Sequence, residues 1–507
     1  MGAGEFAQEP REVELKLELD PAEADRIRSH PVLAAGETSL EDELLISTYF
    51  DTPDFALRQA GVCLRVRDNG GRFIQTIKSA RSAEELLERL EWERELPGPK
   101  PDLAAAEGTA LAPLLTLEVR SALKPLFETR IRRSVRRAER EDAAVEIAID
   151  EGQIVSGTRF APVSEVELEL KRGEAGALFQ LARKLGETVP LRLAVKTKAE
   201  RGFELVEGGD CLSEKARALY IAPDTTSAEA FRTIALNCLR QIIVNEPGTC
   251  AGHAEALHQM RIGLRRLRAA IALFDDIVDG EDRERIVEEL RWITHELGPA
   301  RDLDVFAADV LPLLDEEHPD PEAAAATHRN FKERHAAAYA RARNSVRSDR
   351  FRGALLDLAE WVELGGWATG GGKRERAVAK HAKDELSSLR RQIKKHGAKL
   401  ASLGVGALHK LRIRAKRLRY ATEFFAGTFT SEKAATRRAE SLSALKDLQD
   451  ALGGLNDLAT HKTLFGAGDT NGQELPAWRE DPATKSLLAD AKEAYARFAN
   501  VKPFWKA

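Results

Sequence analysis

Residues 12–19 read EVELKLEL, and every second residue in this stretch is apolar. Because successive side chains of a strand point to opposite faces, Val13, Leu15 and Leu17 share one face and the charged residues share the other. The same period of two recurs in VCLRVR (62–67), FIQTIK (73–78), LEWEREL (90–96), AVEIAID (144–150), SEVELELK (164–171) and LRLAVKTK (191–198). This alternation is typical of half-buried antiparallel strands.

Turn-forming and helical stretches separate these predicted strands. Residues 68–71 (DNGG) and 150–152 (DEG) are rich in turn-forming residues, so we predict hairpin turns at both. Helical stretches are expected at residues 21–29 and 175–187. Many strands with few helices indicate a closed or nearly closed antiparallel barrel, which forms a tunnel, over residues 9–207.

From about residue 227 the hydrophobic period changes to 3.6 and stays helical to about residue 500. Breakers such as Pro247-Gly248 and Gly298-Pro299 divide this half into separate helices. Residues 208–226 contain Gly208-Gly209 and are predicted to be a linker. The expected fold is therefore α+β and multidomain, with a barrel at 9–207, a linker at 208–226 and an all-α domain at 227–500.

The helical half contains an internal repeat. LHQMRIGLRRLRAAIALF begins at Leu257, and LHKLRIRAKRLRYATEFF begins at Leu408. A second match follows each copy, LGPARDLDVF from Leu297 and LGGLNDLATH from Leu452. Paired matches in the same order predict two related helical bundles that face each other.

Composition restricts the classes of protein that this chain can belong to. With 43% hydrophobic and 31% charged residues it reads as globular, and we find no apolar stretch of membrane-spanning length and no secretory signal segment. Cys63, Cys211, Cys238 and Cys250 show no metal-binding spacing, so a reducing, cytoplasmic location is expected. The net charge of −5 combines an acidic first part with a basic helical half, which could attract a polyanion.

Charged residues repeat on one face of several predicted strands. Glu12, Glu14, Lys16 and Glu18 share a face, as do Glu165, Glu167 and Glu169, and as do Arg65 and Arg67. On a single strand such a face is usually solvated. Repetition on several strands favours a sheet that closes with its charges inward, where they must be paired or ligated. A divalent cation bound to an oligophosphate would satisfy both kinds of charge.

The ordered motifs of this half identify a family that they resemble. In chain order they are EVELK (12–16), YFDTPD (49–54), LRVR (64–67), TIK (76–78), Arg89 with Glu91, RIRR (130–133), EIAIDEG (146–152), EVELE (165–169) and KAERGF (198–203). This set, which spans nearly all of residues 9–206, resembles the CYTH or triphosphate tunnel metalloenzyme family. The resemblance implies a tunnel in which water, oriented by a divalent metal ion, attacks a terminal phosphorus.

The resemblance also implies roles for individual residues. The metal ligands for Mg²⁺ or Mn²⁺ would be Glu12, Glu14, Glu165, Glu167 and Glu169. The catalytic cations would be Lys16, Arg65, Arg67 and Lys78, and the substrate-binding cations would be Arg130, Arg132, Lys196 and Lys198. Arg133 competes with Arg130 and Arg132 for one role, and the shared strand parity of Arg130 and Arg132 favours that pair.

Each copy of the repeat carries a basic stripe. On a helix, offsets of 0, 3, 7 and 10 fall on one face. They give His258, Arg261, Arg265 and Arg268 in the first copy, and His409, Arg412, Lys416 and Arg419 in the second. Basic faces are often solvated, and arginine stems often cover a core. Like charges at these spacings nevertheless destabilise a helix, so an anionic ligand explains why both copies carry them.

This repeat resembles the CHAD domain over residues 225–500. The resemblance implies a pseudo-symmetric pair of four-helix bundles that binds inorganic polyphosphate, with His258 and His409 as the leading histidines. Weaker candidates for the same surface are His253, His381, His396, Arg390, Arg391, Lys394 and Lys395.

We therefore predict an enzyme that hydrolyses inorganic triphosphate to pyrophosphate and phosphate. Its helical half would bind polyphosphate, and the protein would lie in the cytoplasm, without a membrane partner and in contact with polyphosphate granules. A non-catalytic polyphosphate-binding protein and an enzyme for an organic triphosphate such as thiamine triphosphate are the alternatives. Nucleic acid is a poor fit, because the basic stripes lack interleaved aromatic residues apart from Tyr420.

Overall fold

The structure is a computed structural model that describes residues 11–34, 42–79, 86–139, 141–209, 212–309, 321–465 and 482–507. The chain forms two compact units, which we describe separately. Unit 1 comprises Met1–Ala216, Leu236–Leu264 and Glu281–Gly365. Unit 2 comprises Arg217–Ala235, Arg265–Gly280 and Gly366–Ala507. The barrel and part of the helical half therefore belong to the same compact unit.

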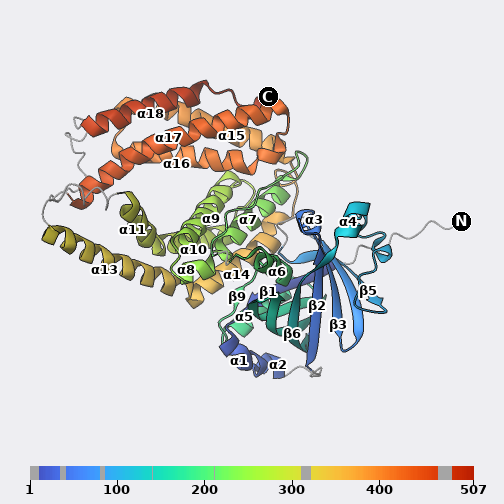
Figure 1. The fold of residues 1–507 in the computed structure, drawn as a ribbon. Coiled ribbons are helices and arrows are strands. Elements are labelled where there is room, and N and C mark those ends of the chain that lie inside the picture. Colours follow the sequence, from blue (N-terminus) through green and yellow to red (C-terminus); the bar gives the residue numbers. More distant parts are fainter. Residues whose placement is uncertain are drawn as a thin grey trace. The chain divides into compact units, whose positions relative to one another are not determined.

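The strands of unit 1 form one antiparallel sheet that closes on itself (Figure 1). In chain order they are β1 (Arg11–Glu18), β2 (Glu43–Asp51), β3 (Val62–Asn69), β4 (Arg72–Ser79), β5 (Glu88–Leu96), β6 (Lys124–Glu139), β7 (Ala144–Ser156), β8 (Arg159–Arg172) and β9 (Arg192–Leu193). Their order in the sheet is β5-β4-β3-β2-β6-β7-β8-β1-β9, and β5 also pairs with β1. This last pairing closes the barrel, which confirms the predicted architecture.

Short helices accompany the barrel strands. They are α1 (Ala24–Arg28), α2 (Pro31–Ala34), α3 (Ala56–Gln59), α4 (Leu117–Ala122), α5 (Gly176–Gly186) and α6 (Lys198–Glu207). The helices α1 and α5 confirm the two helical stretches expected from the sequence. The apolar residues of β1 and β8 that lie opposite the charged face are buried, as Leu15, Val166 and Leu168 illustrate. Apolar burial therefore covers the outer faces of β1 and β8 and leaves their charged faces inside the barrel.

Two local predictions in the barrel are wrong. Residues 150–152 are not a turn, because β7 continues through them to Ser156 and the chain turns at Gly157, which has a φ of 59°. The stretch 191–198 is not a long strand either, because β9 ends at Leu193 and α6 begins at Lys198. The predicted turn at residues 68–71 is confirmed, and Gly70 and Gly71 both adopt positive φ there.

The helix α6 packs closely against one part of the barrel wall. Its Phe203 meets Phe127 edge-on, with ring centroids 5.2 Å apart, and Phe127 stacks on Tyr49 at 4.6 Å. A side chain at Gly202 would lie 2.0 Å from the Phe127 ring, so the absence of a Cβ permits this approach. The contact matters for the site, because α6 begins with a lysine that reaches the barrel interior.

The C-terminal half is helical, as predicted. Unit 1 contains or shares α7 (Ser227–Ile243), α8 (Glu246–Cys250), α9 (Ala254–Leu273), α10 (Glu281–Glu296), α11 (Gly298–Asp309), α13 (Pro321–Val346) and α14 (Asp349–Leu364). Unit 2 contains α15 (Val378–Gly397), α16 (Val405–Phe424), α17 (Glu432–Phe465) and α18 (Pro482–Asn500), which pack in sequence against one another. None of the described helices combines the length and the apolar character needed to span a membrane.

Candidate functional site

Neighbouring strands bring charged side chains together inside the barrel. Lys16 on β1 lies opposite Glu167 on β8, and Asp150 on β7 lies opposite Glu165 on β8. Arg133 on β6 lies opposite Asp150. Because directly opposed residues of an antiparallel pair share a face, these side chains point the same way. We define the lumen cluster as Lys16, Arg133, Asp150, Glu165, Glu167 and Lys198.

Glu167 lies at the centre of the lumen cluster. Its Oε1 accepts hydrogen bonds from Lys16 Nζ at 2.8 Å and Lys198 Nζ at 2.9 Å. Its Oε2 accepts a hydrogen bond from Arg133 Nη2 at 2.6 Å. Burial alone would raise the pKa of Glu167, but these cations outweigh burial and hold the pKa well below its ordinary value. Glu167 is therefore an ionised carboxylate at neutral pH.

Asp150 and Glu165 share the ammonium group of Lys198. The Lys198 Nζ is 2.8 Å from Asp150 Oδ2 and 3.4 Å from Glu165 Oε2. Burial raises the pKa of Glu165 above its ordinary value, although Lys198 acts in the opposite direction. The Oε1 atom of Glu165 is buried and accepts no hydrogen bond within the described residues. The same oxygen lies 3.6 Å from Arg201 Nη1, so both oxygens of Glu165 face cations.

A second group of charges joins β1, β3, β4 and β5. Lys78 Nζ is 2.7 Å from Glu12 Oε2 and 2.8 Å from Glu91 Oε2. Arg65 Nη2 is 3.6 Å from Glu91 Oε1. The predicted residues Glu12, Arg65 and Lys78 are thus brought together, and Glu91 links them.

Positive charge is in excess beside this group. The charge of Arg65, the burial of the side chain and the charge of Arg133 lower the pKa of Arg67 to about 10. The Nε atoms of Arg65 and Arg67 are buried and have no hydrogen-bond acceptor within the described residues. A buried guanidinium N–H without an acceptor is costly, so this part of the interior is suited to a phosphate-like anion.

The carboxylates of the interior are chemically suited to a divalent cation. Glu14, Glu165 and Glu167 offer buried oxygen atoms, and hard cations such as Mg²⁺ prefer oxygen ligands. In the described part of the chain no group of three or more His, Cys, Asp or Glu side chains is arranged to hold a metal ion. Lys16 lies 2.8 Å from both Glu14 and Glu167. The residue types therefore fit a metal ion, whereas in this arrangement Lys16 and Lys198 compensate the negative charge of the carboxylates.

The sequence-based preference for Arg130 and Arg132 as interior residues is wrong. Their side chains are 52% and 57% exposed and pair with Glu128 at 3.1 Å and Glu151 at 3.4 Å. Arg133, on the opposite face of β6, is the member of this basic run that reaches the lumen cluster. The alternation of side chains along β6 could not show which arginines point into the barrel, because both faces of this strand carry arginine.

Other predicted barrel residues differ in their surroundings. Lys196 does not reach the lumen cluster, because it pairs with Glu204 at 2.7 Å and with Glu214. The alternation predicted over residues 191–198 ends at β9, before the chain enters α6. Glu169 lies opposite Glu14 on the interior face, but Lys171 binds it at 2.6 Å. Lys198 does reach the interior, from the first position of a helix.

Sequence reasoning also missed two members of the lumen cluster. Asp150 was assigned to a turn and Arg133 was ranked below its neighbours, yet both belong to the lumen cluster. One signal was available, because AVEIAID places Asp150 on the same strand face as Glu146. That Arg133 lies opposite Asp150 can be inferred only when the register of β6 and β7 is known.

The first basic stripe lies on α9. His258, Arg261, Arg265 and Arg268 are all partly buried there. Arg261 Nη1 donates to the carbonyl oxygen of Thr294 at 3.2 Å, which ties it to α10. Arg265 Nε is buried and has no hydrogen-bond acceptor within the described residues.

The second basic stripe lies on α16. His409 is exposed, whereas Arg412, Lys416 and Arg419 are partly buried. Arg419 pairs with Glu423 at 3.4 Å, and Arg412 Nε repeats the buried, unsatisfied state of Arg265 Nε among the described residues. In the alignment of the repeat Arg412 corresponds to Arg261, and Arg265 corresponds to Lys416.

Three of the weaker polyanion candidates have structural partners. His381 is buried, stacks on Phe274 at 4.5 Å and lies 3.0 Å from the carbonyl oxygen of Leu273. Arg390 donates to the carbonyl oxygens of Phe498, Ala499 and Val501, and Lys394 also donates to Ala499. These contacts satisfy the last carbonyls of α18, as basic side chains at a helix end commonly do. Arg390 and Lys394 therefore stabilise the bundle, and this explains their position without an external ligand.

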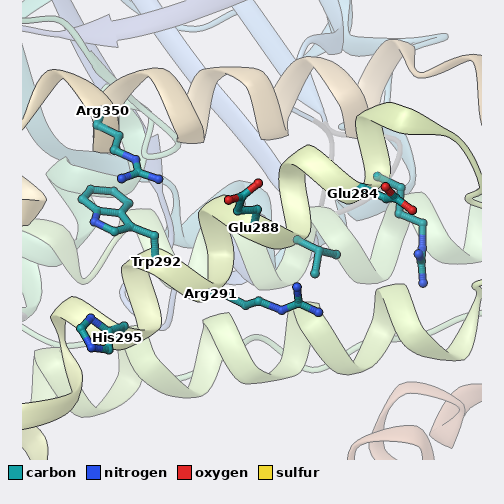
Figure 2. Close-up of a pocket in the computed structure, with 8 residues that line it drawn as sticks. Glu284, Glu288, Arg291, Trp292, His295 and Arg350 are labelled. Atoms are coloured by element: carbon teal, nitrogen blue, oxygen red, sulfur yellow. The ribbon is translucent and has the colours of Figure 1, made fainter.

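A separate groove of about 760 Å³ runs along α10 in unit 1 (Figure 2). Its lining residues are Arg283, Glu284, Val287, Glu288, Arg291, Trp292, His295 and Arg350. The guanidinium of Arg350 lies 4.2 Å from the centre of the Trp292 ring and pairs with Glu289 at 2.9 Å. The groove mixes both signs of charge and was not predicted from the sequence.

Two family models match separate parts of the chain. The family model of the CYTH domain matches residues 10–203, and that of the CHAD domain matches residues 233–466. An inorganic triphosphatase of Haemophilus influenzae is 30% identical over 203 residues, which cover 38% of this chain and 55% of that protein. The chain thus spans about half the length of this curated relative.

Two solved structures resemble separate parts of the chain. The CHAD domain from the plant Ricinus communis is 29% identical and covers 57% of this chain and 91% of its own, with a TM-score of 0.45. A putative adenylyl cyclase from Hippeastrum, described as having a dominant triphosphatase activity, is 18% identical. It covers 38% of this chain and 95% of its own, with a TM-score of 0.31.

Proposed function

Because the chain carries a CYTH domain followed by a CHAD domain, we propose that it is a metal-dependent inorganic triphosphatase whose helical half binds inorganic polyphosphate. The observation that supports this most directly is the interior of the barrel. There, the ionised carboxylate of Glu167 lies in the same lumen as Arg65 and Arg67, whose buried Nε atoms have no acceptor within the described residues. Triphosphate with a bound metal ion has the charges that both groups require.

In the proposed reaction, a water oxygen attacks the terminal phosphorus of triphosphate and the bridging P–O bond breaks, which releases phosphate and pyrophosphate. Glu14, Glu165 and Glu167 would hold the metal, which would supply charge neutralisation and orientation of the water. Arg65 and Arg67 would bind oxygens of the phosphoryl chain. Lys16, Lys78, Arg133 and Lys198 would keep the carboxylates oriented and offset charge that develops on the phosphoryl oxygens.

Removal of divalent metal is expected to stop the reaction. After treatment with EDTA, phosphate release from triphosphate should fall by at least about 100-fold, because the carboxylates would no longer bring a divalent cation to the phosphoryl oxygens. Addition of Mg²⁺ or Mn²⁺ in excess should restore it, and the ratio of the two rates gives the preferred metal. Circular dichroism before and after EDTA controls for unfolding. Full turnover in EDTA would contradict the metal dependence.

The same phosphate-release assay shows which substrate the barrel site prefers. We propose inorganic triphosphate rather than thiamine triphosphate, ATP or long-chain polyphosphate, and we expect kcat/KM to be highest for triphosphate. A higher value for an organic triphosphate would assign the site to that alternative. Binding of all four without phosphate release would support a purely binding role.

For the helical half, we expect Arg265→Ala and Arg412→Ala each to weaken polyphosphate binding by about tenfold. The reason is that each removes a partly buried guanidinium whose Nε has no acceptor among the described residues. Fluorescence anisotropy with labelled polyphosphate at two salt concentrations measures the effect, and affinity should fall steeply with salt.

Arg497→Ala is a matched control for these variants. Arg497 is an exposed arginine on α18 that already pairs with Glu493 at 2.9 Å, so its loss should leave polyphosphate affinity unchanged. Equal losses in all three variants would indicate non-specific attraction to net positive charge. Binding of this kind would place the protein at polyphosphate granules in the cytoplasm, which is part of the proposal.

A further inference from the structure

Lys198 reaches the lumen cluster from a helix end rather than from a strand. It is the first residue of α6, and Thr197 caps this helix. Thr197 Oγ1 accepts a hydrogen bond from the backbone N–H of Glu200 at 3.0 Å, and Glu200 Oε2 accepts one from the N–H of Thr197 at 2.8 Å. This capping box fixes the point at which α6 begins. The position of the Lys198 ammonium group therefore depends on how the chain at residues 195–200 is held.

An arginine from the helical half binds this segment. Arg240 lies on α7 within unit 1 and is 9% exposed. Its Nη1 donates to the carbonyl oxygen of Val195 at 2.7 Å, and its Nη2 donates to Glu200 Oε1 at 3.0 Å. The two acceptors lie on either side of Thr197 and Lys198 in the sequence. One guanidinium thus binds both the chain entering α6 and the carboxylate of its capping box.

The surrounding contacts hold the same segment from its other side. Lys196 pairs with Glu204 at 2.7 Å and with Glu214. The backbone of Glu214 exchanges hydrogen bonds with the side chain of Asn245, at 3.0 and 2.8 Å. Arg240 Nη2 is also 4.0 Å from Glu214 Oε2. Lys196, which was predicted to bind substrate, is thus part of the support for Lys198.

We propose that Arg240 is a positioning residue of the barrel site: by binding Val195 and Glu200 it sets the start of α6 and so places the Lys198 ammonium group among the lumen carboxylates. This inference rests on the proposed triphosphatase function and extends it, because it makes the helical half necessary for full activity of the barrel. Charge-assisted hydrogen bonds in a nearly buried setting are strong and directional, so they restrict movement of the segment.

The size of the expected effect follows from the geometry. Lys198 Nζ is 2.8 Å from Asp150 and 2.9 Å from Glu167, so a small shift of α6 breaks both contacts. A misplacement of about 1 Å can cost on the order of 100-fold in rate. We therefore expect Arg240→Ala to lower kcat/KM for triphosphate by about 10- to 100-fold.

A second arginine provides a matched control. Arg183 on α5 also joins the barrel region to the helical half within unit 1, through Asp357 at 2.7 Å and Glu360, both on α14. None of these residues belongs to the lumen cluster. Arg183→Ala should lower the melting temperature by no more than Arg240→Ala does, because an exposed ion pair contributes little to stability. It should leave kcat/KM within about twofold of the wild type, because neither Arg183 nor its partners contact the lumen cluster.

The test measures kcat, KM and melting temperature for the full-length protein carrying Arg240→Ala, Arg240→Lys, Arg183→Ala or Lys198→Ala, and for the double variant Arg240→Ala with Lys198→Ala. Coupled residues give non-additive effects. If Arg240 acts through Lys198, Arg240→Ala should lower kcat/KM little further in a protein that already carries Lys198→Ala. Arg240→Lys should recover part of the activity. If Arg240→Ala does not fold, Glu200→Gln removes the charged partner of Arg240 while its amide oxygen can still accept from Thr197.

The outcomes separate this inference from the proposed function. A wild-type protein without triphosphatase activity would overturn the proposed function. An active wild type in which Arg240→Ala and Arg183→Ala give equal kcat/KM would overturn only the positioning role. Fully additive losses in the double variant would also overturn it, because they would mean that Arg240 does not act through Lys198.

Discussion

Glu167→Gln is expected to reduce kcat for triphosphate hydrolysis by on the order of 10²–10³-fold, the size of loss typical for removal of one electrostatic contact at an active site. Glutamine keeps the shape of the side chain but removes the charge that Lys16, Arg133 and Lys198 all bind. The substitution therefore removes a proposed metal ligand and leaves three cations partly uncompensated. Phosphate release at saturating substrate and metal measures the loss.

The control for Glu167→Gln is Glu95→Gln. Glu95 lies on β5, is 62% exposed and pairs with Arg72 at 3.0 Å, so its charge can be removed without affecting the lumen cluster. Loss of one member of a buried ion pair can cost about 3–5 kcal/mol of stability. The melting temperature of each variant must therefore be known, and the assay must run well below it. Wild-type turnover in a folded Glu167→Gln protein would remove Glu167 from the site.

The second large effect is expected at Arg133. Arg133→Ala should lower kcat/KM for triphosphate by about 100-fold or more, because its guanidinium binds Asp150 through two hydrogen bonds of 2.7 Å and also binds Glu167. Its loss would leave two buried carboxylates with one cation fewer. Steady-state kinetics, with circular dichroism to confirm the fold, measures the change.

Arg132→Ala is the matched comparison for Arg133→Ala, because it changes the adjacent residue of the same strand. Arg132 is exposed and its one described partner contact, with Glu151, is 3.4 Å long. Its replacement should leave kcat/KM within about twofold, as expected for an exposed ion pair. If Arg132→Ala proves to be the damaging change, the inward face of β6 has been assigned incorrectly.

The period of two in the N-terminal half was sufficient to predict a closed barrel with a charged interior. The alternation in EVELKLEL and SEVELELK placed Glu14, Lys16, Glu165 and Glu167 on shared faces, and the structure brings them together. This succeeded because a strand determines its own two faces through local backbone geometry. Apolar residues on the other face then require burial, which leaves the charges inside once the sheet closes.

The same reasoning failed where a face had no local marker. In RIRR, Arg132 and Arg133 are chemically identical, and the shared parity of Arg130 and Arg132 was the basis for preferring that pair. In the structure Ile131, which has the parity of Arg133, belongs to an apolar cluster with Tyr49 and Phe127. The register between β6 and β7, and not the sequence of β6, determines that Arg133 meets Asp150.

Sequence alone determined the fold class, the change from strands to helices near residue 227, and the inward charged faces of β1 and β8, because each follows from interactions between near neighbours in the chain. Only the tertiary structure decided that Arg133 rather than Arg132 enters the lumen, that Lys198 arrives from a helix end, and that Arg240 binds the segment which precedes it. Those contacts join residues far apart in the sequence. Strand register and helix packing fix them, and no local period encodes either one.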